Sequence, residues 1–160
     1  MSDAMKKKLW ILWILLGAVP GVVLWLFLVK AGYAGEFAGV LIGFGAVALY
    51  RWSGAELKYS KMIVGAILLL AIAIITNQLG YSLDIYNKFA ENWYGAAGNE
   101  FTFGDAFTTV WDSFVVKNAE GMRKFYIEAA IQGILCSLLF WIALFVYYRK
   151  LDELENGEGE

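Results

Sequence analysis

Three long stretches with few or no charged residues constrain this chain more than any other feature of its sequence. Residues 9–29 and 62–83 carry no charge over 21 and 22 positions, and residues 125–148 carry one acid, Glu128, over 24 positions. About 20 apolar residues are enough for a helix to cross the hydrocarbon core of a bilayer, whereas soluble cores rarely need uncharged runs of this length. The pattern therefore predicts an all-α integral membrane protein.

A shorter apolar segment at residues 33–50 lies between the first two runs. We predict four transmembrane helices, at about residues 9–29, 33–50, 62–83 and 125–148. The four helices would form a single domain over residues 9–150, with an external segment at residues 84–124. A basic N-terminus at residues 1–8 and an acidic tail at residues 151–160 would flank this domain.

Composition supports a membrane protein and argues against several kinds of functional site. Hydrophobic residues make up 60% of the chain and charged residues 18%, against about 25% charged residues in soluble domains. The chain has no histidine, which is the commonest general base and transition-metal ligand. Its single cysteine, Cys136, excludes an intrachain disulfide and a cysteine-based zinc site. We therefore predict no cofactor and no metal site. The chain also has no basic stripe or nucleic-acid recognition motif, so we predict no nucleic-acid partner. The bilayer is the expected environment, and Trp and Tyr gather at the segment ends, as is typical of membrane boundaries.

The distribution of basic residues predicts the orientation in the membrane. Basic residues are concentrated before the first apolar run, between the second and third, and after the fourth. They are Lys6, Lys7, Lys8, Arg51, Lys58, Lys61, Arg149 and Lys150. Short segments rich in Lys and Arg stay in the cytoplasm, so both termini should be cytoplasmic in a multi-pass protein of the cell membrane. The first apolar run is longer than a signal-peptide core, and we interpret it as a retained anchor.

Glycines recur at intervals of four in the first two predicted helices. Gly17 and Gly21 flank Pro20 in the first helix, and Gly35, Gly39 and Gly43 form a glycine zipper in the second. Without side chains at these positions a neighbouring backbone can approach closely, which drives helix association in lipid. The two glycine faces predict a tightly packed antiparallel hairpin. The alternatives are an interface between copies of the chain and a glycine-lined conduit.

The external segment contains a predicted interfacial helix at about residues 103–116. Thr102 and Asp105 have the spacing of a helix N-terminal cap, although a capping box proper prefers Glu or Gln at the second position. Apolar residues then follow at helical spacing, including Phe103, Phe107 and Trp111. The helix would be about 20 Å long, too short and too charged to span the bilayer. It would either seal the end of the bundle or act as a lid.

Polar residues cluster in the predicted outer half of the bundle. This candidate recess consists of Glu36, Asn77, Gln78, Asp84, Glu128 and Gln132. Polar groups that face hydrocarbon are costly, so these side chains should face one another or water. The functional interpretation is an outward-facing recess for a cation or small solute, with Asp84 beside Glu128. The structural interpretation is a hydrogen-bonded cluster with acids at the membrane boundary.

Three sequence segments carry a resemblance to a known group of proteins. They are Tyr50-Arg-Trp-Ser-Gly54, Leu83-Asp-Ile-Tyr86 and Phe101-Thr-Phe-Gly-Asp-Ala-Phe107. With them, residues 10–145 resemble small bacterial four-helix integral membrane proteins that have no assigned activity. The resemblance implies this topology in a bacterial cytoplasmic membrane and transfers no site.

Three classes of function fit these observations. The first is a non-enzymatic membrane protein that acts by assembly, as a homo-oligomer or as the small subunit of a membrane complex. The second is a small transporter or channel that uses the polar recess. The third is a membrane enzyme, which would need a carboxylate pair such as Asp84 and Glu128 because no catalytic signature is present. The small size of the chain and its packing motifs favour the first class.

Overall fold

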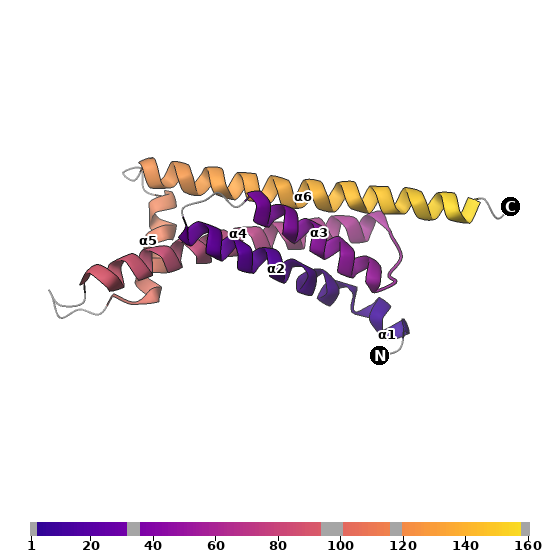
Figure 1. Ribbon diagram of the computed structural model, residues 1–160, viewed down its shortest axis with the longest axis horizontal. Helices are drawn as coiled ribbons and strands as arrows, with labels where there is room; N and C mark the ends of the chain where they lie inside the picture. The colour runs from indigo at the N-terminus through magenta and orange to yellow at the C-terminus, as the bar shows by residue number, and fades with distance from the viewer. Residues whose placement is uncertain (1–2, 32–35, 94–100, 116–119, 158–160) are drawn as a thin grey trace.

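The computed structural model describes residues 3–31, 36–93, 101–115 and 120–157, and it confirms that the protein is helical. The helices are α1 (Asp3–Lys8), α2 (Trp10–Lys30), α3 (Glu36–Trp52), α4 (Tyr59–Trp93), α5 (Phe103–Val115) and α6 (Glu120–Gly157). Helices α2, α3, α4 and α6 run along the long axis of the molecule, and α5 crosses one end of it (Figure 1).

Three helical segments are long and apolar enough to cross a membrane. They are Trp10–Lys30 in α2, Tyr59–Lys88 in α4 and Ile127–Glu155 in α6. The apolar part of α3, Phe37–Trp52, is shorter. Length and composition therefore support a helical membrane protein with three candidate spans and a shorter apolar helix beside them.

Two helices extend beyond the predicted spans. Helix α4 continues past Leu83 to Trp93, because no glycine or proline interrupts residues 81–93 and the helix can continue outside the apolar run. Helix α6 begins at Glu120 and ends at Gly157, so part of the predicted acidic tail is helical. The segment at residues 84–124 is thus less loop-like than its composition indicated.

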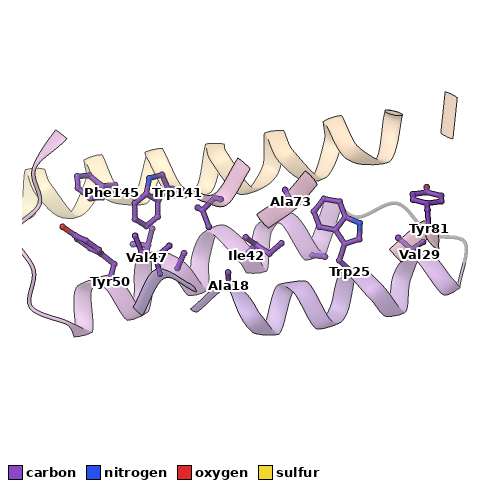
Figure 2. Packing of buried hydrophobic residues seen from close by; sticks show 14 of the residues in the cluster. Ala18, Trp25, Val29, Ile42, Val47, Tyr50, Ala73, Tyr81, Trp141 and Phe145 are labelled. Atoms are coloured by element: carbon purple, nitrogen blue, oxygen red, sulfur yellow. The ribbon is translucent and has the colours of Figure 1, made fainter. Parts of the chain in front are cut away.

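The four long helices pack as a ring in the order α2, α3, α6 and α4. Helix α3 packs mainly against α2 and α6, and α4 packs mainly against the same two helices. Contacts between α3 and α4 are few, so these two helices lie diagonally across the bundle. The buried core runs along the whole bundle and includes Trp25, Ile42, Val47, Tyr50, Ala73, Trp141 and Phe145 (Figure 2).

Glycines allow close helix packing, but their partners differ from the predicted hairpin. Gly17 lies against the backbone of Gly45, which joins α2 to α3. Gly39 and Gly43 instead face α6, where a Cβ on either glycine would come within 3.0 Å of existing atoms, including the backbone of Gly133 opposite Gly39. Gly45, which meets α2, therefore lies on one face of α3, whereas Gly39 and Gly43 of the predicted zipper lie on another face. Gly35 lies outside the described residues.

Large aromatic side chains occupy the space over two other glycines. The indole of Trp25, from α2, lies against Gly133, and the indole of Trp141, from α6, lies against Gly65 of α4. Both tryptophans are fully buried (Figure 2). A side chain at either glycine would displace an indole, so these pairs fix how the helices fit together.

Candidate functional site

The buried polar residues of α4 form the strongest candidate site. Thr76, Asn77, Gln78 and Ser82 are all buried although they lie in a candidate membrane span. We call these four residues the polar segment of α4. Buried amides and hydroxyls need hydrogen-bond partners, because an unpaired polar group in an apolar interior is costly. The partners of this segment therefore determine what it does.

Two described hydrogen bonds show how the segment is used. The Gln78 Nε2 group donates to the backbone carbonyl oxygen of Phe107 at 3.1 Å, which connects α4 to α5. The Ser82 hydroxyl donates to the carbonyl oxygen of Gln78, one turn earlier, at 2.7 Å. The first bond anchors the crossing helix and the second stays within α4. Both are structural uses of polar groups.

Helix α5 lies across the bundle with its small residues inward. Ala106 and Val110 are buried, whereas Phe103, Phe107 and Trp111 are exposed. Tyr86 of α4 packs edge to face against Phe103, with ring centroids 6.2 Å apart. An exposed aromatic row on a short helix at the end of a bundle is typical of a helix at the membrane interface.

The predicted cap of α5 is confirmed by reciprocal hydrogen bonds. The Asp105 carboxylate accepts from the Thr102 backbone N–H at 2.8 Å and from the Thr102 hydroxyl at 2.7 Å. The Asp105 N–H in turn donates to the Thr102 hydroxyl at 3.2 Å. These bonds favour the charged carboxylate, so the pKa of Asp105 is lowered from its ordinary value, first by the Thr102 hydroxyl and then by the Thr102 N–H.

The acids of the predicted recess have different surroundings. Asp84 is partly buried and forms an ion pair with Lys88, one turn later, at 2.6 Å. Glu128 is exposed on α6. The side chain of Glu36 lies outside the description. A proton- or cation-sharing pair of Asp84 and Glu128 thus stays a prediction.

Gln132 is also exposed, which differs from the predicted inward orientation of Glu128 and Gln132. The inward face of α6 is occupied by small residues, Ala129, Gly133 and Ser137, which are buried against the other helices. Residues 128 and 132 share a face because they are four apart, but that face lies on the outside of the bundle. The structure therefore brings together the buried part of the cluster on α4 and leaves the α6 part exposed.

An aromatic cluster lies at the end of the bundle opposite to α5, and the sequence did not predict it. The rings of Tyr50, Trp141 and Phe145 pack against one another with centroids 5.6–5.9 Å apart, and Trp10 lies against Tyr50. The Tyr50 hydroxyl donates to the carbonyl oxygen of Glu56, and the Trp141 Nε1 group donates to that of Met62. The positions of Trp10, Tyr50 and Trp141 near the segment ends indicated membrane boundaries. Only the structure shows that Tyr50 and Trp141 are fully buried.

Charged side chains bind the end of α6 to its neighbours. Arg51 of α3 forms two hydrogen bonds to the Asp152 carboxylate at 2.8 and 3.0 Å. Arg149 lies over the ring of Tyr59, with 3.8 Å from its Cζ to the centroid. These contacts attach the helical extension of α6 to α3 and α4. No sequence motif predicts these contacts, because the partners are about 100 residues apart in the sequence.

Among the described residues, no group of three or more Cys, Asp and Glu side chains could hold a metal ion. Comparisons with known protein families, curated proteins and solved structures found no match to this chain.

Proposed function

We propose that the chain is a non-enzymatic polytopic protein of a bacterial cell membrane that acts by assembly. It would work as a homo-oligomer or as the small subunit of a membrane complex. In this proposal α3 is a fourth membrane-crossing helix, and both termini are cytoplasmic. The outer end of the bundle is then the end that α5 crosses.

The proposed topology is supported by the arrangement of α3 and of the basic residues. Helix α3 lies between α2 and α6 within the bundle, and 17 residues of helix cover about 25 Å. Helix α1 and the C-terminal end of α6 lie toward the same end of the molecule (Figure 1). Arg51, Lys58, Lys61 and Arg149 belong to the helix ends and connection there, where a positive cytoplasmic surface is expected.

The observation that carries the proposal is the apolar surface that the bundle leaves uncovered. Within an apolar stretch of 18 residues in each candidate span, only 28–33% of the residues are buried within the chain. The remaining surface is largely apolar and must face lipid or other helices. In the same spans, the described polar bonds of Gln78, Ser82 and Ser137 all go to backbone carbonyls of this chain. The Gln78 bond holds α5 against α4, and the other two bonds lie within single helices. All three serve the structure of the chain, which supports a role in assembly.

The alternative is a small transporter or channel for a cation or solute. The buried amides of Asn77 and Gln78 favour it, because they could line a polar path in another conformation. The aromatic cluster at the other end weighs against it. Tyr50, Trp141 and Phe145 fill that half of the core, so a continuous path would require these side chains to move or several copies to form it.

Isolation of two differently tagged copies tests the assembly proposal. Both copies are produced at low level in one cell and extracted with polymer that retains surrounding lipid. We expect isolation through one tag to recover the other tag, or to recover a second protein in fixed stoichiometry. Recovery of one tagged chain without either would contradict assembly. Cation or solute flux through vesicles that contain only the single chain would favour the transporter instead.

A further inference from the structure

Gln132 differs from the other Asn, Gln, Ser and Thr side chains that lie at least five residues inside the candidate spans. Thr76, Asn77, Gln78, Ser82 and Ser137 are all buried, whereas Gln132 is exposed. Within the part of the chain that the structure describes, its amide has no hydrogen-bond partner. Gln132 lies 17 residues before Arg149, which places it about 25 Å from the cytoplasmic boundary and inside a hydrocarbon core of about 30 Å.

An amide on that surface is costly if lipid covers it. A polar group in hydrocarbon loses its bonds to water, and the loss is recovered when another helix supplies a partner. Glutamine is one of the side chains that form hydrogen bonds between helices in membranes. The position of Gln132 therefore points to a protein partner on this face of α6.

The face that carries Gln132 has the spacing of a helix–helix seam. Exposed residues follow at alternating intervals of three and four, and we call this set the α6 seam: Gln132, Leu135, Leu139, Ile142 and Val146. The four apolar members are 40–63% exposed. An average interval of 3.5 residues keeps such a row facing one partner along a left-handed crossing.

The opposite face of α6 is already used within the chain. Ala129, Gly133, Ser137, Trp141 and Phe145 repeat at intervals of four and are all buried. The two rows lie on opposite sides of the helix, because 100° per residue places their centres about 180° apart. The seam is thus free to bind outside the bundle while the bundle stays intact.

We propose that the α6 seam binds the α6 seam of a second copy of this chain. The inference rests on the proposed function, because it names the partner and the surface of that assembly. All copies insert in one orientation, so a two-fold axis perpendicular to the membrane makes the two α6 helices parallel. Gln132 then faces Gln132 of the second copy at equal depth. An amide contains both a donor and an acceptor, so the two side chains satisfy each other.

The seam also explains why this surface fits a second copy better than an unrelated helix. Two identical amides at one depth are complementary by symmetry, whereas a purely apolar helix would leave Gln132 unpaired. On the cytoplasmic side of Gln132, the seam offers only uncharged leucine and β-branched side chains: Leu135, Leu139, Ile142 and Val146. The interface therefore needs no charge from another protein.

Disulfide crosslinking of single-cysteine variants in membranes tests the seam. In a Cys136→Ala background, Leu139→Cys should form a disulfide-linked dimer under mild oxidation. The matched control is Ile67→Cys on α4, since Leu139 and Ile67 are 63% and 60% exposed and both lie in candidate spans. Because both side chains are exposed, neither change should unfold the bundle. Equal crosslinking at the two positions would overturn the proposed seam, because it would reflect random collision.

Gln132 itself provides the second test. Gln132→Leu should raise the dimer dissociation constant in detergent or lipid by about 3- to 20-fold, whereas Gln132→Asn, which keeps the amide, should change it much less. An unchanged or lower constant for Gln132→Leu would overturn the role of the amide.

If two tagged copies are recovered together but Leu139→Cys does not crosslink above the control, the seam is wrong and assembly stands. Crosslinking of Leu139→Cys only to a different protein would refute the second copy as the partner. If neither a second copy nor any partner is recovered, the proposed function fails and the seam fails with it.

Discussion

Gly39 and Gly43 allow α3 to approach α6 at backbone distance. A Cβ on Gly39 would lie within 3.0 Å of the backbone of Gly133, which cannot move without shifting a whole helix. At Gly104, on exposed α5, the nearest described atom would be the Thr102 hydroxyl at 3.5 Å, an ordinary contact. Gly39 and Gly104 both lie in helices and differ in how closely they are packed, so they form a matched pair for substitution.

We predict that Gly39→Ala lowers the free energy of unfolding by about 1–3 kcal/mol, because the added methyl overpacks the contact between α3 and α6. Gly104→Ala should leave stability unchanged or slightly raised, since alanine favours the helix. Thermal or denaturant unfolding in one detergent measures both variants. A Gly39→Ala protein as stable as the Gly104→Ala protein would exclude close packing at this point.

Tyr50 contributes a hydrogen bond from the fully buried aromatic cluster to the connection after α3. Tyr50→Phe removes the hydroxyl that donates to the Glu56 carbonyl oxygen and keeps the ring contacts with Trp141 and Phe145. We expect a loss of about 1 kcal/mol in unfolding free energy. Tyr147→Phe, on an exposed position of α6, is the control and should have little effect. Equal stability of the two variants would show that the buried hydroxyl contributes nothing.

At the scale of the element, α5 is held to the bundle mainly by α4, with a smaller contact to α6. The bond from Gln78 to the Phe107 carbonyl oxygen attaches it to α4, and its buried residues are small. We predict that Gln78→Leu increases hydrogen exchange of the α5 amides while the amides of α2 remain protected. Uniform loss of protection in both helices would show that Gln78 stabilises the whole bundle and not the attachment of α5 alone.

The cap of α5 gives this helix a pH dependence. The folded-state pKa of Asp105 is lower than the unfolded-state value, because Thr102 stabilises the carboxylate. The contribution of the carboxylate to stability is therefore complete above the unfolded-state value, near pH 4, and is lost as the pH falls through the folded-state value. We expect protection of the α5 amides, corrected for intrinsic exchange, to decrease below about pH 4. In Asp105→Asn this decrease should be absent, and its persistence there would assign it to another group.

At the scale of the whole molecule, much of the helical framework could be predicted from the sequence. Uncharged runs determine where helices cross a bilayer, and a hydroxyl and an acid at capping distance determine where α5 begins. Which face of a helix meets which neighbour could not be predicted. Gly39 and Gly43 face α6 rather than α2, and Gln132 lies on the outer face although its polarity favoured the interior. Helix order around the ring decides these contacts, and that order depends on contacts between residues far apart in the sequence, such as Gly39 and Gly133.

The proposed topology has a direct chemical test. In a Cys136→Ala background, Asp112→Cys on α5 and Glu155→Cys on α6 place thiols on exposed positions at the two ends of the bundle. A membrane-impermeant maleimide should label the first on intact cells and the second only after the cells are opened. Labelling of Glu155→Cys alone on intact cells would reverse the orientation.

The mass of the intact particle in lipid nanodiscs tests the central claim most directly. A single chain has a mass of 17.9 kDa, so lipid-corrected masses separate one chain, several chains and a complex with another protein. The account predicts either a whole-number multiple of the chain mass or the chain with a partner in fixed stoichiometry. A particle that contains one chain and no other protein, prepared at the concentration of the native membrane, would contradict it.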